Sequence, residues 1–84
     1  MKVNIELRNR ILTIVAEQIS TNNPPEVKKT YLRLQQEGFD EMDSKKLIGQ
    51  CVALELYEII KNQNPFNLER YIKNLTLLPN EPEV

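Results

Sequence analysis

The stretch from Glu41 to Asn62 constrains this chain most, because no proline and no turn signal interrupts its mainly apolar sequence. Its centre, Leu47 to Ile60, is too long for one β-strand, so the stretch is predicted to be a helix of about six turns. At 100° per residue its apolar side chains fall into two stripes, whereas a surface helix normally shows one. Such a helix is either wedged between layers of its own chain or shared with a second subunit.

The two stripes predict different surroundings for the two sides of this helix. One stripe consists of Ile48, Val52, Leu56, Ile59 and Ile60, with small Gly49 and Ala53 beside it. The other lies nearly opposite and consists of Leu47, Cys51 and Leu54, bordered by Gln50, Glu55 and Glu58. We expect the second stripe, Leu47, Cys51 and Leu54, to be the interface with another protein or a second copy. The alternative contact is the unused part of the wide apolar face of the first helix.

The first helix is predicted over Val3 to Ser20, where the apolar residues cover an arc of about 200°. Arg8 and Gln18 interrupt this face. We expect the Arg8 stem to run along the apolar surface and Gln18 to make a side-chain hydrogen bond.

The second helix is predicted from Pro24 to Glu37, with Asn23 as its N-cap and Glu26 completing a variant of the capping box. Gly38 is the expected stop, and Asp40 is expected to cap the helix that follows. The cations of the second helix lie outside its apolar stripe and are expected to be solvated: Lys28, Lys29 and Arg33.

The last helix is predicted from Leu68 to Leu77, after an N-cap at Asn67. Phe66 before the cap and Tyr71 in the first turn have the spacing of a hydrophobic staple. Residues 79–84 are acidic and rich in proline, so we expect a flexible tail.

Together these segments predict an all-α fold, a compact four-helix bundle with short connections and antiparallel neighbours. We expect residues 1–78 to form one helical domain. At a length of 84 residues a domain buries roughly 60 to 65% of its unfolded surface, so the core is thin and association would supplement it.

The residue types present argue against an enzyme. The chain has no histidine and two isolated glycines, which excludes histidine-based acid–base catalysis, imidazole metal sites and a phosphate-binding glycine loop. Cys51 lies mid-helix among apolar residues, where a thiol is normally a small hydrophobe. Glu55 and Glu58 could face a cation but are expected to form a solvated edge. We therefore expect no catalytic residues, no metal and no cofactor.

The net charge and the hydropathy of the chain limit which partners and which cellular compartment we expect. The formal net charge of −1 provides no field to attract nucleic acid or an anionic membrane. No apolar run approaches the roughly 18 residues of a membrane span. The single cysteine, and an N-terminus without the apolar core of a signal peptide, favour the cytoplasm.

The second helix, its corner and the central helix have the outline of a helix-turn-helix, so a nucleic-acid-binding accessory module is the alternative function. The would-be recognition helix begins with the acids Asp40, Glu41 and Asp43. Their charge opposes phosphate binding, and nucleic acid is therefore not expected as a partner.

Several short motifs carry a family resemblance. They are Val15-Ala16-Glu17-Gln18-Ile19, Pro24-Pro25-Glu26-Val27, Arg33-Leu34 with Glu37-Gly38-Phe39-Asp40, Leu47-Ile48-Gly49, and Pro65-Phe66 with Tyr71 and Leu75-Thr76. Through them the chain from about Leu12 to Thr76 resembles a family of small, uncharacterised bacterial helical proteins, a domain of unknown function. The resemblance implies that the first helix packs antiparallel to the start of the third, and it implies no activity.

Commoner members of that family carry histidines where this chain has none. A His-Glu-x-x-His run stands where this chain has Met42-Asp43-Ser44-Lys45-Lys46, and a further His and Glu stand where it has Leu12 and Ala16. In those members the two pairs would make a plausible metal constellation. This chain departs at every one of these positions, so we expect a divergent, metal-free branch. The sequence favours a function as a protein-interaction or scaffolding module. We expect the module to bind an unknown protein partner or to form a homodimer.

Overall fold

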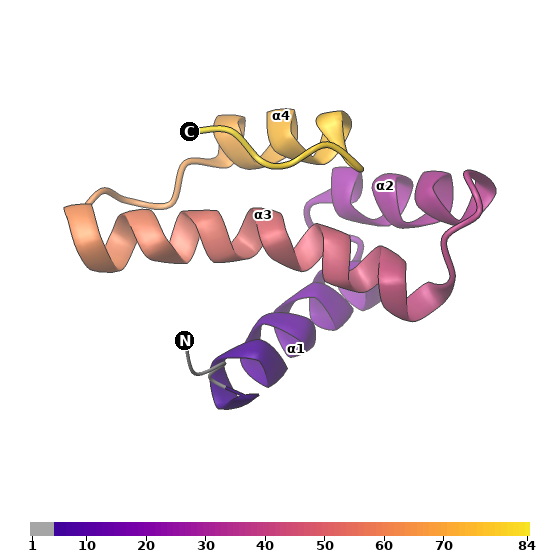
Figure 1. Ribbon diagram of the computed structural model, residues 1–84, viewed down its shortest axis with the longest axis horizontal. Coiled ribbons are helices and arrows are strands. Elements are labelled where there is room, and N and C mark those ends of the chain that lie inside the picture. Colours follow the sequence, from indigo (N-terminus) through magenta and orange to yellow (C-terminus); the bar gives the residue numbers. More distant parts are fainter. Residues whose placement is uncertain (1–4) are drawn as a thin grey trace.

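The computed structural model describes residues 5–84 and contains four α-helices with short connections (Figure 1). The helices are α1 (Ile5–Thr21), α2 (Pro25–Gln36), α3 (Glu41–Asn62) and α4 (Leu68–Leu77). No strand occurs among these residues. The all-α four-helix fold is confirmed, and the predicted ends differ by one residue at the end of α1 and at both ends of α2. The predicted start of the first helix at Val3 lies outside the described residues.

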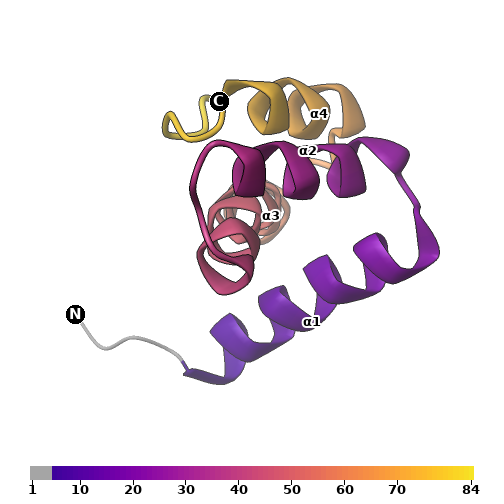
Figure 2. The same cartoon turned by 90° about the vertical axis from the view of Figure 1, so that its right-hand side faces the viewer.

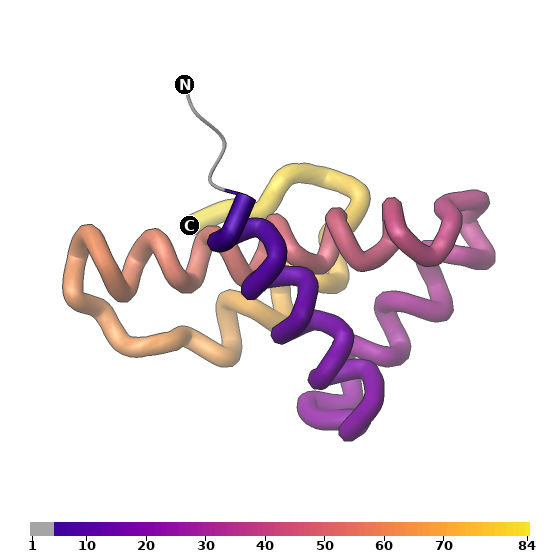
Figure 3. The backbone as a smooth tube through the Cα atoms, turned by 90° about the horizontal axis from the view of Figure 1, so that it is seen from below, coloured from indigo at the N-terminus to yellow at the C-terminus, as the bar shows by residue number. Residues whose placement is uncertain are grey.

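The other three helices lie around α3. Viewed along α3, α2 and α4 lie on one side and α1 on the other (Figure 2). α1 crosses α3 obliquely (Figure 3), so the antiparallel packing implied by the resemblance is wrong. The crossing falls at Gly49, where an added Cβ would lie 3.1 Å from Cγ2 of Ile11. The missing side chain allows the two helices to approach closely enough for this crossing.

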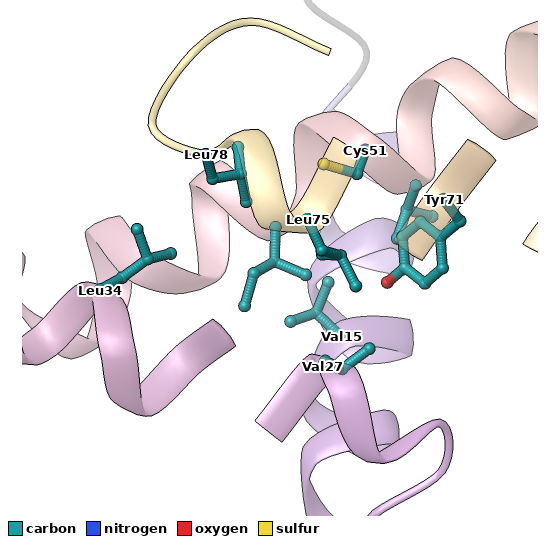
Figure 4. Close-up of a cluster of buried hydrophobic side chains, with 9 residues drawn as sticks. Val15, Val27, Leu34, Cys51, Tyr71, Leu75 and Leu78 are labelled. Atoms are coloured by element: carbon teal, nitrogen blue, oxygen red, sulfur yellow. The ribbon is translucent and has the colours of Figure 1, made fainter. Parts of the chain in front are cut away.

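All four helices contribute side chains to one core (Figure 4). The buried apolar residues are Val15, Val27, Leu34, Ile48, Cys51, Val52, Tyr71, Leu75 and Leu78. The first predicted stripe of α3 is buried at Ile48 and Val52, whereas Ile59 is 36% and Ile60 is 74% exposed. α1, over Ile5–Thr21, passes under the middle of α3 and does not reach its last turns, so α1 does not cover this end of the stripe.

Local signals form the corner between α2 and α3 as predicted. Gly38 adopts a φ of +105°, and its N–H donates to the Gln35 carbonyl at 3.1 Å, as at many helix C-termini. The Asp40 side chain accepts a hydrogen bond of 2.7 Å from the Asp43 N–H and caps α3. The corner thereby fixes where α3 starts.

The start of α4 also follows the sequence prediction. Asn67 Oδ1 accepts a hydrogen bond of 3.0 Å from the backbone N–H of Arg70. The rings of Phe66 and Tyr71 meet edge to face with centroids 5.3 Å apart, which confirms the staple. The Tyr71 hydroxyl donates to Gln18 Oε1 at 2.7 Å, so Gln18 makes the predicted side-chain hydrogen bond and ties α1 to α4.

Two predictions about α2 are wrong. Pro24 and not Asn23 precedes the helix, and no side chain caps it. Two consecutive prolines place Asn23 one residue too early to cap. Arg33 is not simply solvated, because its guanidinium donates to Glu37 at 2.7 Å and to the Leu75 carbonyl at 3.0 Å, which ties α2 to α4.

Residues 79–84 fold back beside α4 and α3 (Figures 1 and 3). Leu78 is buried at the turn. Asn74, also buried, donates from Nδ2 to the Glu83 carbonyl at 2.9 Å, and the Glu83 N–H donates to Asn74 Oδ1 at 2.8 Å. One side-chain amide thus holds the backbone of the tail in place. The tail is predicted to be flexible. This stays a prediction, because it concerns the motion of the tail and not its position.

The close crossing at Gly49 can be tested by filling it. Gly49→Leu should lower the free energy of unfolding by roughly 1 to 3 kcal/mol, because the added side chain overlaps Ile11 and pushes α1 away. Ala16→Leu, at an exposed position of α1, is the control and should change stability little. Urea denaturation followed by circular dichroism gives both values. Equal stability of the two variants would contradict the crossing.

Candidate functional site

Two of the three residues predicted as an interface reach the surface. Leu47 and Leu54 are half-buried, whereas Cys51 is fully buried in the core cluster with Tyr71 and Leu75 (Figure 4). Because α4 packs on this side of α3, the thiol is enclosed and cannot contact another protein. Cys51 was therefore wrongly assigned, while an interface at Leu47 and Leu54 stays a prediction.

A regular spacing links Leu47 and Leu54 along one side of α3. Intervals of four and three residues alternate through Asp43, Leu47, Gln50, Leu54, Tyr57 and Lys61. These six residues are called the α3 seam below, since this is the spacing at which one helix packs along another in a coiled coil. Tyr57 is 52% exposed, and the three polar members are exposed. An acid begins the seam, a cation ends it, and an amide lies between its apolar residues.

Two hollows lie beside the α3 seam. The larger, of about 510 Å³, lies between α3 and the tail and is lined by Gln50, Ala53, Leu54, Tyr57, Glu81 and Pro82. The smaller, of about 190 Å³, lies beside the first half of the seam and is lined by Phe39, Asp43, Lys46, Leu47 and Gln50. The seam is therefore flanked along its length by space for the side chains of a partner.

Two buried acids between α3 and α4 form a network in place of the predicted solvated edge. Glu55 is fully buried and Glu58 is 6% exposed. Arg70 donates from Nε at 2.6 Å and from Nη2 at 2.9 Å to the two oxygens of Glu55. The Asn67 N–H donates to Glu55 at 2.8 Å. Glu58 lies 3.5 Å from Arg70 Nη1 and accepts a hydrogen bond from the Asn62 amide. The prediction failed because the start of α4 brings Arg70 close to both carboxylates and the Asn67 N–H to Glu55.

These contacts keep the Glu55 carboxylate ionised. Burial raises the pKa of Glu55, but the hydrogen bonds from Arg70 and from the Asn67 N–H, with the Arg70 charge, outweigh burial and leave the pKa below its usual value. The hydrogen bond to Glu55 in turn raises the pKa of Arg70. The network holds α4 on α3, and neither charge is free for chemistry.

The Cys51 thiol and the Tyr71 side chain are buried as well. Burial, followed by the charge of Glu55, raises the pKa of the Cys51 thiol to about 12. Burial likewise raises the pKa of Tyr71. Both groups are protonated at neutral pH and offer neither nucleophile nor base.

Within residues 5–84, no three acidic or cysteine side chains are grouped to hold a metal ion. No helix in this range is long and apolar enough to cross a membrane.

The corner between α2 and α3 has helix-turn-helix connectivity but an acidic start to its second helix. Asp40, Glu41 and Asp43 lie in or next to the first turn of α3. The following Lys45 places its Nζ 5.9 Å from the ring centre of Tyr31 on α2. The arrangement of charges therefore gives no support to the nucleic-acid alternative.

Gln50 and Tyr57 were missed as members of the exposed side of α3. The alternation of four and three residues was present in the sequence, but grouping by hydrophobicity placed Cys51 in the interface, left Gln50 at its border and omitted Tyr57. Arg70 was missed for another reason. No local signal shows that a residue of α4 will meet Glu55.

Acid should weaken the fold through Glu55. Because its folded pKa is lowered, its contribution to the free energy of unfolding is complete above the unfolded pKa of about 4.3 and is lost as the pH falls through the folded pKa. Glu55→Gln should lower the unfolding free energy at neutral pH by roughly 3 kcal/mol and flatten its dependence on acid. The measurement is urea denaturation from neutral pH to about pH 3. The control is Glu17→Gln, at an exposed position. It should leave the pH dependence of the unfolding free energy as in the wild type, whereas Glu55→Gln should change it.

Cys51 should resist thiol reagents in the folded protein. With a raised pKa and no exposed surface, it should react with an aromatic disulfide reagent at least about a hundredfold more slowly than in the same protein unfolded in urea. Absorbance of the released thiolate measures both rates. Rapid stoichiometric reaction of the folded protein would show that the thiol is accessible.

Comparison with known proteins places the chain in a family. No curated protein and no solved structure matches it. Residues 9–77 match the family described as "Domain of unknown function (DUF1841)". The match spans most of the chain and overlaps the region of the resemblance found in the sequence. The chain belongs to this family, whose domain has no assigned function.

Proposed function

We propose that this protein is an interaction module that associates with a second copy of itself through the α3 seam. The observation that carries the proposal is the four–three spacing of Leu47, Gln50, Leu54 and Tyr57 along α3, where Gln50 and Tyr57 are exposed and the two leucines are half-buried. A single exposed leucine needs no explanation, but apolar residues repeated at this spacing beside two hollows suit the packing of another helix.

A second copy is the partner that the composition favours. The net charge of −1 produces little repulsion between copies, and the thin core of a small domain gains from added apolar burial. Among residues 5–84, the other large aliphatic side chains that are at least half exposed are Ile5, Leu32, Ile60, Leu68 and Val84, at 66%, 50%, 74%, 51% and 85%. One lies on each of the four helices and one in the tail. They form no repeat along one helix and lie outside the α3 seam.

The proposal includes the absence of catalysis and a cytoplasmic location. The reactive side chains described above are protonated or paired inside the fold. The single cysteine supports a reducing compartment.

Self-association can be measured by light scattering after size exclusion. The mass should be that of a dimer and should fall toward a monomer on about tenfold dilution near the dissociation constant. Leu54→Asp should raise the dissociation constant at least about tenfold, because it buries a charge in the interface. Tyr57→Ala should weaken association too, and it spares the core because Tyr57 is half exposed. Circular dichroism checks that the variants fold.

Leu32→Asp is the matched control. Leu32 is 50% exposed and lies on α2, outside the α3 seam. The variant should leave the mass unchanged. A monomer at every concentration would overturn self-association. A dimer that Ile60→Asp disrupts and Tyr57→Ala leaves intact would place the interface on another side of α3.

A further inference from the structure

The α3 seam is complementary to itself in one direction. Its intervals of four, three, four, three and four residues read the same from either end. Asp43 and Lys61 occupy its two ends, Leu47 and Tyr57 lie inside them, and Gln50 and Leu54 flank the centre. Reversing the seam therefore matches an acid with a cation at both ends.

We infer that two copies pair through antiparallel α3 helices, with Asp43 of each facing the partner's Lys61. Leu47 then faces the partner's Tyr57, and Gln50 faces the partner's Leu54. This inference rests on the proposed function, and it specifies the direction and the register of the second copy. A seam of this length extends about 27 Å at 1.5 Å per residue.

Charge favours the antiparallel over the parallel arrangement. A parallel pair would place Asp43 next to the partner's Asp43 and Lys61 next to the partner's Lys61, so both ends would repel. An antiparallel pair turns both repulsions into attractions and also opposes the two helix dipoles. Lys61 already lies toward this side of α3, since its Nζ is 5.5 Å from the ring centre of Tyr57.

The hollows fit the antiparallel register as well. The larger hollow lies beside the second half of each seam, so it would receive the first half of the partner's seam, including the partner's Leu47. Glu81 lines this hollow, and Lys46 lines the smaller hollow beside the first half. The pairing brings Glu81 toward the partner's Lys46, which adds opposite charges on each side. The hydrogen bonds between Asn74 and Glu83 hold the tail in the position from which Glu81 lines the larger hollow.

Charge reversal tests the register. Asp43→Lys and Lys61→Asp should each raise the dissociation constant of the dimer roughly tenfold, because each change creates two like-charge contacts per dimer. The double variant Asp43→Lys with Lys61→Asp restores both pairs and should return to within about threefold of wild type. Sedimentation equilibrium at low salt measures all four proteins, and the effect of the single changes should shrink at high salt.

Lys28→Glu, which reverses one exposed charge on α2, should change the dissociation constant less than about threefold. Thermal unfolding identifies any variant that loses its fold. A dimer that both single changes weaken and the double variant fails to restore would overturn the antiparallel register while leaving self-association intact. A wild-type monomer would overturn the proposed function and the register together.

Discussion

The ion pair between Glu55 and Arg70 determines which side of α3 belongs to the core. A carboxylate with no exposed surface is unfavourable unless cations and donors compensate for its lost hydration. Arg70 supplies two hydrogen bonds and the Asn67 N–H supplies a third. All three donors come from the start of α4, so satisfying Glu55 fixes where α4 begins on α3. Placed there, α4 covers Cys51 and leaves Tyr57 and the polar residues of the α3 seam exposed.

Polar side chains then fix α4 against the rest of the chain. Tyr71 reaches α1 through Gln18, Arg33 of α2 donates to the backbone of α4, and Asn74 holds the tail. In a core this small, apolar contacts alone leave several positions of a short helix nearly equal in energy. Directional hydrogen bonds distinguish these positions, because each one is satisfied in a single arrangement.

Local signals predicted the fold well, whereas contacts between helices escaped the sequence. Gly38, Asp40 and Asn67 act on residues within one turn of themselves, so their roles can be found without knowing the tertiary structure. Glu55 meets Arg70 across two helices, and periodicity along one helix does not reveal where another will lie. The same limit explains the candidate interface. The side of α3 carrying Leu54 was found, but Cys51 was assigned to it because the position of α4 was unknown.

In the proposed dimer, one side of α3 stabilises the fold and the other side binds the second copy. Its buried side is complete within one chain, since the charge of Glu55 is paired and Cys51 is enclosed. The α3 seam lies on a preformed helix, so binding there orders only side chains and avoids the larger entropic cost of folding a segment on contact. The half-buried Leu47 and Leu54 belong to both sides. In the proposed dimer, association would bury the remaining apolar surface of both leucines, at about 25 cal/mol per Å², without moving the core residues against which Leu47 packs.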